Sequence, residues 1–169
     1  MKRYCFDTSG FSNPHETMPE DIPIYAPLWA QMVEFVESGA VAATTEIYSQ
    51  MCKIPDDFGE CLRQNKARIL LEVGDASWSF QTYIDHFTRM QRQYHAHISE
   101  YSHAGSKRTI DIPDLTIIAL GRTLGIPVVS MEVTTGQSPD KRRIPDICLM
   151  EGVVHRTFNE FLKDEKIGT

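Results

Sequence analysis

The sequence predicts an α/β domain in which a mainly parallel central sheet is covered by helices on both faces. Short apolar runs that suit buried strands lie at residues 3–6, 41–43 and 126–130. Longer segments with helical periodicity separate these runs, and the link before the third run is short. Strands that alternate with helices in this way pair in parallel, with right-handed crossover connections.

The composition indicates one domain of a cytoplasmic protein. A chain of 169 residues, with 41% hydrophobic and 24% charged residues, can bury a single core, so we treat residues 1–169 as one domain. No apolar stretch approaches the roughly 20 residues that cross a bilayer. Asp7 comes too early for a signal peptide. We therefore expect cytoplasmic localisation and no membrane partner.

The net charge of -6 argues against a broad basic surface that wraps nucleic acid. It does not argue against nucleic-acid chemistry, because clustered acids can themselves be the site. The four cysteines form no CxxC pair, which argues against a zinc ribbon. We expect all four to be reduced thiols in a reducing compartment.

The first half of the chain is expected to begin with the strand at residues 3–6. Ser and Gly soon after it indicate a turn, and three prolines predict an irregular loop over residues 12–24. Pro27 suits the first turn of a helix that ends near Gly39.

The second strand, residues 41–43, is followed by two threonines that can cap the next helix. Either Asp56 or Asp57 is expected to cap a further helix. Apolar residues spaced three and four apart then predict a long helical stretch over about residues 78–101.

In the last third, a strongly apolar helix is expected to begin at residues 112–114 and to end at Gly125. A polar loop over residues 134–143 and a short helix follow. Residues 153–154 are expected to form a last strand. The pattern Thr157-x-x-Glu160 matches a capping box for the final helix.

Four acidic residues are candidates for a common site. Asp7 directly follows the first strand, Glu46 opens the helix after the second, and Glu132 follows the third. The carboxyl ends of parallel strands share one edge, where open α/β sheets place their ligands, so these three are expected to meet there. Asp114 is less well placed by this argument, because its helix precedes a strand.

Carboxylates gathered at one edge repel one another. Two of them about 4 Å apart cost on the order of 4 kcal/mol at an effective dielectric of about 20. A group of four is therefore either partly protonated or built around cations. Oxygen ligands favour Mg²⁺ or Mn²⁺, and such a site can activate water for an in-line displacement at phosphorus.

Each acid also has an ordinary structural interpretation. Glu46 can favour a helix N-terminus through the dipole, Asp114 can be an N-cap, and Glu132 can face solvent at a strand end. Asp7 is harder to explain in this way, because an acid directly after a buried first strand has few structural uses.

Three segments resemble, in order, the signatures of PIN-domain nucleases. Residues 4–9, Tyr-Cys-Phe-Asp-Thr-Ser, resemble the opening strand of that family. Residues 114–120, Asp-Leu-Thr-Ile-Ile-Ala-Leu, are similar to its second signature, and residues 128–132, Val-Val-Ser-Met-Glu, to its third. Glu46 matches the family's glutamate after the second strand. The order and spacing of these motifs cover residues 3 to about 133.

The resemblance implies a PIN-like, Rossmann-like three-layer fold and a Mg²⁺- or Mn²⁺-dependent endoribonuclease that cleaves RNA with metal-activated water. The family's catalytic acids map to Asp7, Glu46, Asp114 and Glu132. On this hypothesis Asp7, Asp114 and Glu132 hold the cation. Glu46 ligates it directly or through water, or orients the nucleophile.

Further residues are expected to support this site. Three are predicted to hydrogen-bond to the metal ligands: Thr8, Ser9 and Ser130. Asp146 is predicted to replace an acid that the family often has after the third strand. Those predicted to grip phosphates are Lys107, Arg108, Arg142 and Arg143.

Residues 141–148, Lys-Arg-Arg-Ile-Pro-Asp-Ile-Cys, resemble a branch of PIN-like proteins whose members are thought to be toxins of bacterial toxin–antitoxin pairs. The partners that this implies are an RNA substrate and a protein antitoxin. The helical stretch around residues 78–101 could hold that antitoxin or a second copy in a homodimer.

Two features depart from the PIN pattern. The third-signature acid is Glu132 rather than the commoner Asp, so its side chain is longer and its geometry less fixed. The acid often found a few residues later is absent, since Thr134 and Thr135 stand there. Either Asp146 substitutes for it or a second metal is absent.

Two other functions remain open at the level of the sequence. One is a phosphatase or phosphotransferase with Asp7 as nucleophile, although the commonest loop of that kind has a second Asp where Ser9 stands. The other is a PIN-like binding protein with weak or no turnover, which the missing later acid would suit.

Overall fold

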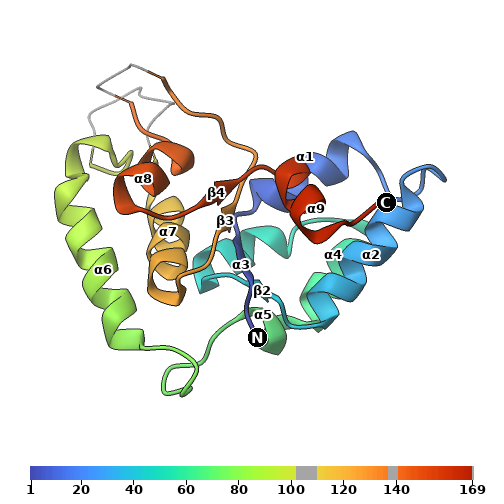
Figure 1. The fold of residues 1–169 in the computed structure, drawn as a ribbon, viewed down its shortest axis with the longest axis horizontal. Coiled ribbons are helices and arrows are strands. Elements are labelled where there is room, and N and C mark those ends of the chain that lie inside the picture. The colour runs from blue at the N-terminus through green and yellow to red at the C-terminus, as the bar shows by residue number, and fades with distance from the viewer. Residues whose placement is uncertain (102–109, 137–140, 169) are drawn as a thin grey trace.

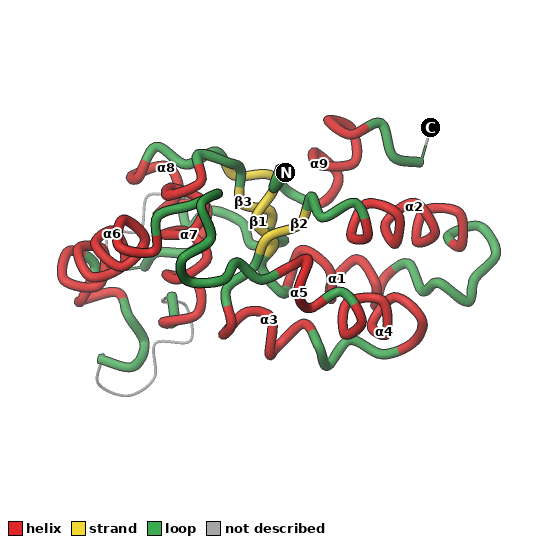
Figure 2. Tube along the Cα trace, turned by 90° about the horizontal axis from the view of Figure 1, so that it is seen from below, coloured by secondary structure: helices red, strands yellow, loops and turns green. Residues whose placement is uncertain are grey.

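A four-stranded parallel sheet separates two layers of helices, which confirms the predicted α/β class (Figures 1 and 2). The structure is a computed structural model that describes residues 1–101, 110–136 and 141–168. The strands run in the order β2 (Val41–Ala42), β1 (Tyr4–Phe6), β3 (Val128–Val129) and β4 (His155–Arg156). Because β1 and β3 are neighbours, the segments that follow them leave the sheet side by side.

The strands are short and the inner ones are fully buried. Tyr4 pairs with Val41 on one side of β1, and Cys5 pairs with Val128 on the other. The ladder continues one residue beyond β1, where the Asp7 N–H donates to the Val129 carbonyl at 2.9 Å. The sheet therefore holds the backbone of Asp7 directly.

One face of the sheet is covered by a layer centred on α7 (Ile112–Leu124), which contacts both β1 and β3. Helices α6 (Phe80–Gln93), α8 (Ile144–Glu151) and α3 (Thr45–Met51) pack against α7 (Figure 1). The turn η1 (His95–His97) follows α6. Most of α7 is buried, as expected from its apolar sequence.

The opposite layer contains α1 (Ser9–Thr17), α2 (Ala26–Glu37), α4 (Asp56–Gln64) and α9 (Phe158–Glu165), and the short α5 (Lys66–Ile69) contacts β2. Aromatic rings fill this layer. Phe6 stacks on Phe11 with ring centroids 4.1 Å apart, and Phe161 meets Phe6 edge-on at 5.0 Å. Edge-to-face and offset ring pairs of this kind add to the stability gained from burial alone.

Helix α1 corrects two sequence-based expectations. A turn after Asp7 and an irregular loop over residues 12–24 were expected, but a helix begins at Ser9 and contains Pro14. Proline costs helix stability because it lacks an N–H and crowds the preceding turn. Burial of Phe11, Pro14 and His15 in the aromatic layer outweighs that cost.

The N-terminus of α4 is capped from a distant part of the chain. Asp56 and Asp57 were expected to provide the cap, but the Glu20 carboxylate accepts from the N–H groups of Asp57 at 2.6 Å and Phe58 at 3.0 Å. Asp56 has a φ of 66°, a left-handed conformation that moves its side chain out of the capping position.

Two further boundaries differ from expectation. The helix predicted over residues 78–101 ends at Gln93, where η1 follows, although its stripe continues to the buried Ile98. The last strand is His155–Arg156 rather than residues 153–154, because Val153 is used to close α8 through its N–H bond to the Cys148 carbonyl. The capping box of α9 and the stop of α7 at Gly125 were predicted correctly, and the cap of α7, which was not predicted, is Asp111.

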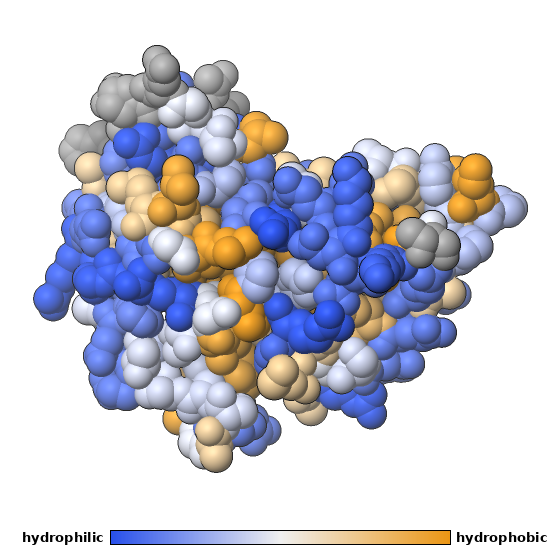
Figure 3. All heavy atoms as spheres, viewed as in Figure 1, coloured by the Kyte–Doolittle hydropathy of each residue, from blue (hydrophilic) through white to orange (hydrophobic). Residues whose placement is uncertain are grey.

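The surface is mostly hydrophilic, with apolar side chains gathered in the hollow between the two layers on the face shown in Figure 3. All four cysteines are free thiols, as predicted. None of the helices in the described part of the chain is both long and apolar enough to cross a membrane.

A buried carboxylate ties α6, α7 and α8 together. Glu151 is 5% exposed and accepts from Arg89 at 2.5 and 3.0 Å and from the Tyr94 hydroxyl at 2.5 Å, with Arg122 at 3.1 Å. Burial acts to raise the pKa of Glu151. The hydrogen bonds from Arg89 and Tyr94 and the charges of both arginines outweigh burial, so the pKa lies below its usual value of 4.5.

We expect Glu151→Gln to lower the free energy of unfolding by about 2 kcal/mol at neutral pH, because it removes one side of a buried ion pair whose arginines stay partly hydrated. A depressed carboxyl pKa stabilises the fold above the unfolded-state value, and this stabilisation is lost as the pH falls through the folded-state pKa. The difference from wild type should therefore shrink below pH 4.5 in urea unfolding. The exposed Glu34→Gln is the control, and a constant difference down to about pH 2 would contradict the assignment.

Candidate functional site

Asp7 lies at the carboxyl end of β1 and is 5% exposed. Its Oδ2 accepts hydrogen bonds from the Ser9 N–H at 3.0 Å and the Ser9 hydroxyl at 2.6 Å, both in the first turn of α1. Burial raises the pKa of Asp7 in spite of these bonds, and the nearby charge of Asp111 raises it further. The side chain is thus fixed in place while its negative charge is poorly compensated.

Two aspartates lie at the N-terminus of α7. The Asp111 Oδ1 accepts from the Asp114 N–H at 2.8 Å, and the Asp114 Oδ2 accepts from the Asp111 N–H at 3.0 Å, which forms a capping box. Burial raises the pKa of Asp114 to about 9, and the charges of Asp111, Asp7 and Glu132 contribute. Asp114 is therefore close enough to the other acids to feel their charge.

Glu132 follows β3 and reaches the start of α8, where its Oε2 accepts from the Ile144 N–H at 2.9 Å. Burial raises the pKa of Glu132, with contributions from Asp7 and Asp111. The hydrogen bond from Ile144 and the charge of Arg143 act in the opposite direction. The N-terminus of α8 therefore holds the Glu132 carboxylate in place, while the charges of Asp7 and Asp111 act on it.

We call Asp7, Asp111, Asp114 and Glu132 the carboxylate cluster. The structure brings together three of the predicted acids, including Asp114, which topology alone placed poorly. Asp111 was not predicted. The signal that could have identified it is the Asp-Ile-Pro-Asp run, since an N-cap aspartate often precedes a proline in the first helical turn.

Glu46 differs from the other predicted acids in its surroundings. It is exposed in the first turn of α3, and it is not one of the principal charges that act on the cluster. Its charge acts instead on Tyr83 of α6, whose pKa is raised by burial and by Glu46. The cap of its helix is Thr44, as predicted.

The predicted supporting residues divide into two groups. Ser9 bonds directly to Asp7, and the Ser130 hydroxyl accepts from the Glu132 N–H at 3.3 Å while it contacts His155 at 2.8 Å. Thr8 hydrogen-bonds to Asp7 through its backbone, whereas its hydroxyl donates to Gln50 of α3 at 2.9 Å.

Asp146 is used to hold the loop before α8 rather than to complete the cluster. It accepts from Thr135 and from the Arg143 N–H at 2.8 Å. Of the basic residues predicted to grip phosphates, Arg143 lies beside Glu132, and Arg142 bonds to the Lys141 carbonyl at 2.9 Å. Lys107 and Arg108 lie outside the described residues.

The donor set of the carboxylate cluster fits a hard divalent cation. All four side chains offer oxygen, and burial raises the pKa of Asp7, Asp114 and Glu132, which a cation would reverse. The charges of Asp7, Asp111 and Glu132 act on other acids of the cluster, but no three of these four described residues have ligand atoms that all lie within 4.8 Å of one another, so they do not form a closed cage. Mg²⁺ suits that arrangement, because it keeps several waters and uses few protein ligands.

A second group of possible ligands lies elsewhere. Across the residues that the structure describes, the set of at least three His, Cys, Asp or Glu whose ligand atoms all lie within 4.8 Å of one another is His15, Glu20 and Asp56. Both oxygens of Glu20 already bond to the N-terminus of α4, and His15 Nε2 contacts Glu20 at 3.3 Å. These contacts explain the group as a helix cap.

A family model described as Domain of unknown function (DUF4411) matches residues 4–169. The chain belongs to the DUF4411 family. The matched region of this DUF4411 domain contains the whole sheet and the complete carboxylate cluster. No curated protein and no solved structure matches the chain.

Ser9→Ala should lower the free energy of unfolding by about 1–3 kcal/mol. The hydroxyl donates to Asp7 and also accepts from the Met131 N–H at 3.0 Å, so its loss removes one of the hydrogen bonds to the buried Asp7 and the acceptor of the Met131 N–H. Urea unfolding measures the change, with Ser49→Ala as the control because that hydroxyl bonds within an exposed turn of α3. Equal stability of Ser9→Ala and wild type would contradict the described geometry.

Proposed function

We propose that this DUF4411 domain is a metal-dependent endoribonuclease. The single observation that supports this best is the convergence of four carboxylates, Asp7 buried and the other three half-buried, from the segments after β1 and β3 and from the N-terminus of α7 on one edge of a parallel sheet. Buried acids with raised pKa values and few nearby cations are typical of functional sites rather than of structural ion pairs. The resemblance of the three acid-bearing segments to PIN-domain nucleases points to phosphodiester hydrolysis.

In this proposal Asp7, Asp114 and Glu132 hold Mg²⁺ or Mn²⁺, and Asp111 stands next to them. The bound cation supplies an activated water and stabilises charge at phosphorus. Ser9 keeps Asp7 oriented, and the Ile144 N–H keeps Glu132 oriented. Glu46 lies further out, so we propose that it acts through water and not as a direct ligand.

Arg143 is the basic residue best placed to meet a phosphate. It begins the α8 segment beside Glu132, so an anionic backbone that approaches the cluster passes its guanidinium. We further propose that the enzyme is the toxin of a bacterial toxin–antitoxin pair, which rests on the resemblance of residues 141–148 to that branch of PIN-like proteins.

Asp7→Asn and Asp114→Asn should each reduce cleavage of a single-stranded RNA in Mn²⁺ by at least about a hundredfold, because each removes charge from the cation site. Gel analysis of the products measures the rates. Asp85→Asn is the matched control, an exposed acid of α6 whose bond from Gln81 an asparagine oxygen can keep. Equal cleavage by the two cluster variants and wild type would refute the nuclease assignment, and a phosphoenzyme trapped on Asp7 would instead support a phosphotransferase.

Mn²⁺ should raise the Tm of wild-type protein, since a ligand at about 100 times its Kd stabilises the folded state by about 2.7 kcal/mol. Asp114→Asn should lose most of this increase. Asp56→Asn tests the group of His15, Glu20 and Asp56 separately, and this variant should keep the increase in Tm with Mn²⁺. Asparagine tolerates the left-handed backbone at residue 56, so the variant should fold. An increase that disappears in Asp56→Asn and persists in Asp114→Asn would place the metal outside the carboxylate cluster.

A further inference from the structure

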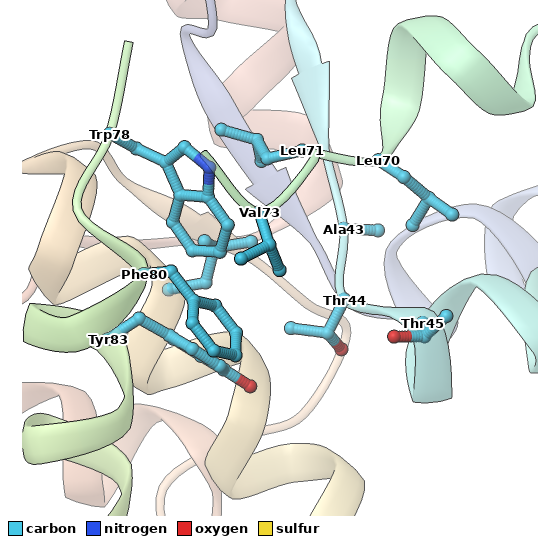
Figure 4. Close-up of a pocket in the computed structure, with 10 residues that line it drawn as sticks. Ala43, Thr44, Thr45, Leu70, Leu71, Val73, Trp78, Phe80 and Tyr83 are labelled. Atoms are coloured by element: carbon cyan, nitrogen blue, oxygen red, sulfur yellow. The ribbon is translucent and has the colours of Figure 1, made fainter. Parts of the chain in front are cut away.

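An aromatic pocket lies between the residues that follow β2 and the start of α6 (Figure 4). It has a volume of about 140 Å³, and we define it by Thr44, Leu71, Val73, Trp78, Phe80 and Tyr83. Figure 4 shows the three rings along one wall and the residues that follow β2 along the other, with Val73 between them. Val73 and Phe80 are 70% and 37% exposed, so apolar surface remains open to solvent at the mouth.

The rings of this aromatic pocket are held in place before any ligand binds. The Trp78 Nε1 donates to the Glu72 carbonyl at 2.8 Å, which fixes the indole. Ring centroids of Trp78 lie 5.7 Å from both Phe80 and Tyr83. The Ser79 hydroxyl caps α6 between them. A preformed site of this kind binds with little loss of side-chain entropy.

A chain of hydroxyls runs from the aromatic pocket to the first turn of α7, the helix whose N-terminus carries Asp111 and Asp114. Thr44 shares a 2.8 Å hydrogen bond with Thr116 of α7, and Thr116 donates to the Pro113 carbonyl at 2.6 Å. Thr116 stands two residues after Asp114 and also hydrogen-bonds to the Tyr83 side chain. The far wall of the pocket and the acids are therefore parts of the same sheet edge.

The size and lining of the pocket indicate one planar polar ring. Pockets for drug-sized ligands are roughly 300–1,000 Å³, so 140 Å³ suits a single ring rather than a peptide segment. Aromatic walls stack nucleobases, and Thr44, Thr45 and Tyr83 add hydroxyl-bearing side chains to the lining.

We propose that the aromatic pocket receives one nucleobase of the single-stranded RNA whose backbone reaches the carboxylate cluster. This inference rests on the proposed nuclease function, which supplies the strand. It adds a base contact to a site otherwise built from carboxylates. A stacked base would fix the register of the strand and so decide which phosphate lies at the acids.

The test compares a fluorescently labelled single-stranded hexanucleotide RNA with the same backbone carrying abasic sugars, both bound to the full chain in Ca²⁺ and measured by anisotropy. Wild type should bind the RNA with bases about fivefold to a hundredfold more tightly. Phe80→Leu, which keeps apolar volume but removes the π face, should reduce this preference, and Phe80→Trp should keep it. Tyr101→Leu is the control, an exposed aromatic outside the pocket.

Equal affinity of wild type for the two RNAs, or a full preference in Phe80→Leu, would overturn the pocket assignment. If Phe80→Leu fails to fold, RNA that contains 2-aminopurine answers the question with wild type: quenching of its emission on binding is expected, and unchanged emission overturns the proposal. Cleavage assays in Mn²⁺ separate the two hypotheses. Cleavage with no base preference would refute the pocket alone, whereas base preference without cleavage would refute the nuclease function alone.

Discussion

The close packing of α7 on the sheet is the constraint on which the rest of the structure depends. Gly121 faces β3 so closely that an added Cβ would lie 2.7 Å from the Val128 side chain. Because α7 lies this near, its N-terminus reaches the edge where β1 and β3 end, and Asp111 and Asp114 arrive there with it. Gly10 does the same for α1, since a Cβ there would lie 2.9 Å from the Val129 carbonyl.

The same packing explains why the side chains of the carboxylate cluster are fixed in orientation and why their negative charge lowers the stability of the fold. Their hydrogen bonds come from the backbone and from Ser9, groups that orient a carboxylate without neutralising it. Burial then raises the pKa of three of them, so the cluster weakens the fold until a proton or a cation compensates its charge. The buried Glu151 shows the contrast, because two arginines surround it and its pKa falls. The two acidic groups of this molecule therefore differ in how their charge is compensated, and burial outweighs the opposing contributions only in the carboxylate cluster.

Several elements could be predicted because their signals are local. The alternation of apolar runs and helical segments indicated the parallel sheet, and Thr44 and Gly125 correctly marked helix boundaries. The signals that failed were outweighed by contacts between distant residues. Pro14 lies inside α1 because the aromatic layer buries it, and Glu20 caps α4 from a different part of the chain. A proline count or a neighbouring aspartate contains no information about either contact.

For the site, the sequence was enough to predict that Asp7 and Glu132 follow buried parallel strands and so lie at the same carboxyl edge of the sheet. Only the tertiary structure decided the strand order, which makes β1 and β3 neighbours, and the other groups that join these two acids, since both follow from the packing of distant elements. It brought Asp111 and Asp114 to that edge through the depth at which α7 packs, and it placed Glu46 beside Tyr83 instead. It also assembled the aromatic pocket from β2, α6 and the segment between α5 and α6. The physical reason is that periodicity specifies the direction and face of an element, whereas the distance between elements depends on side chains from both.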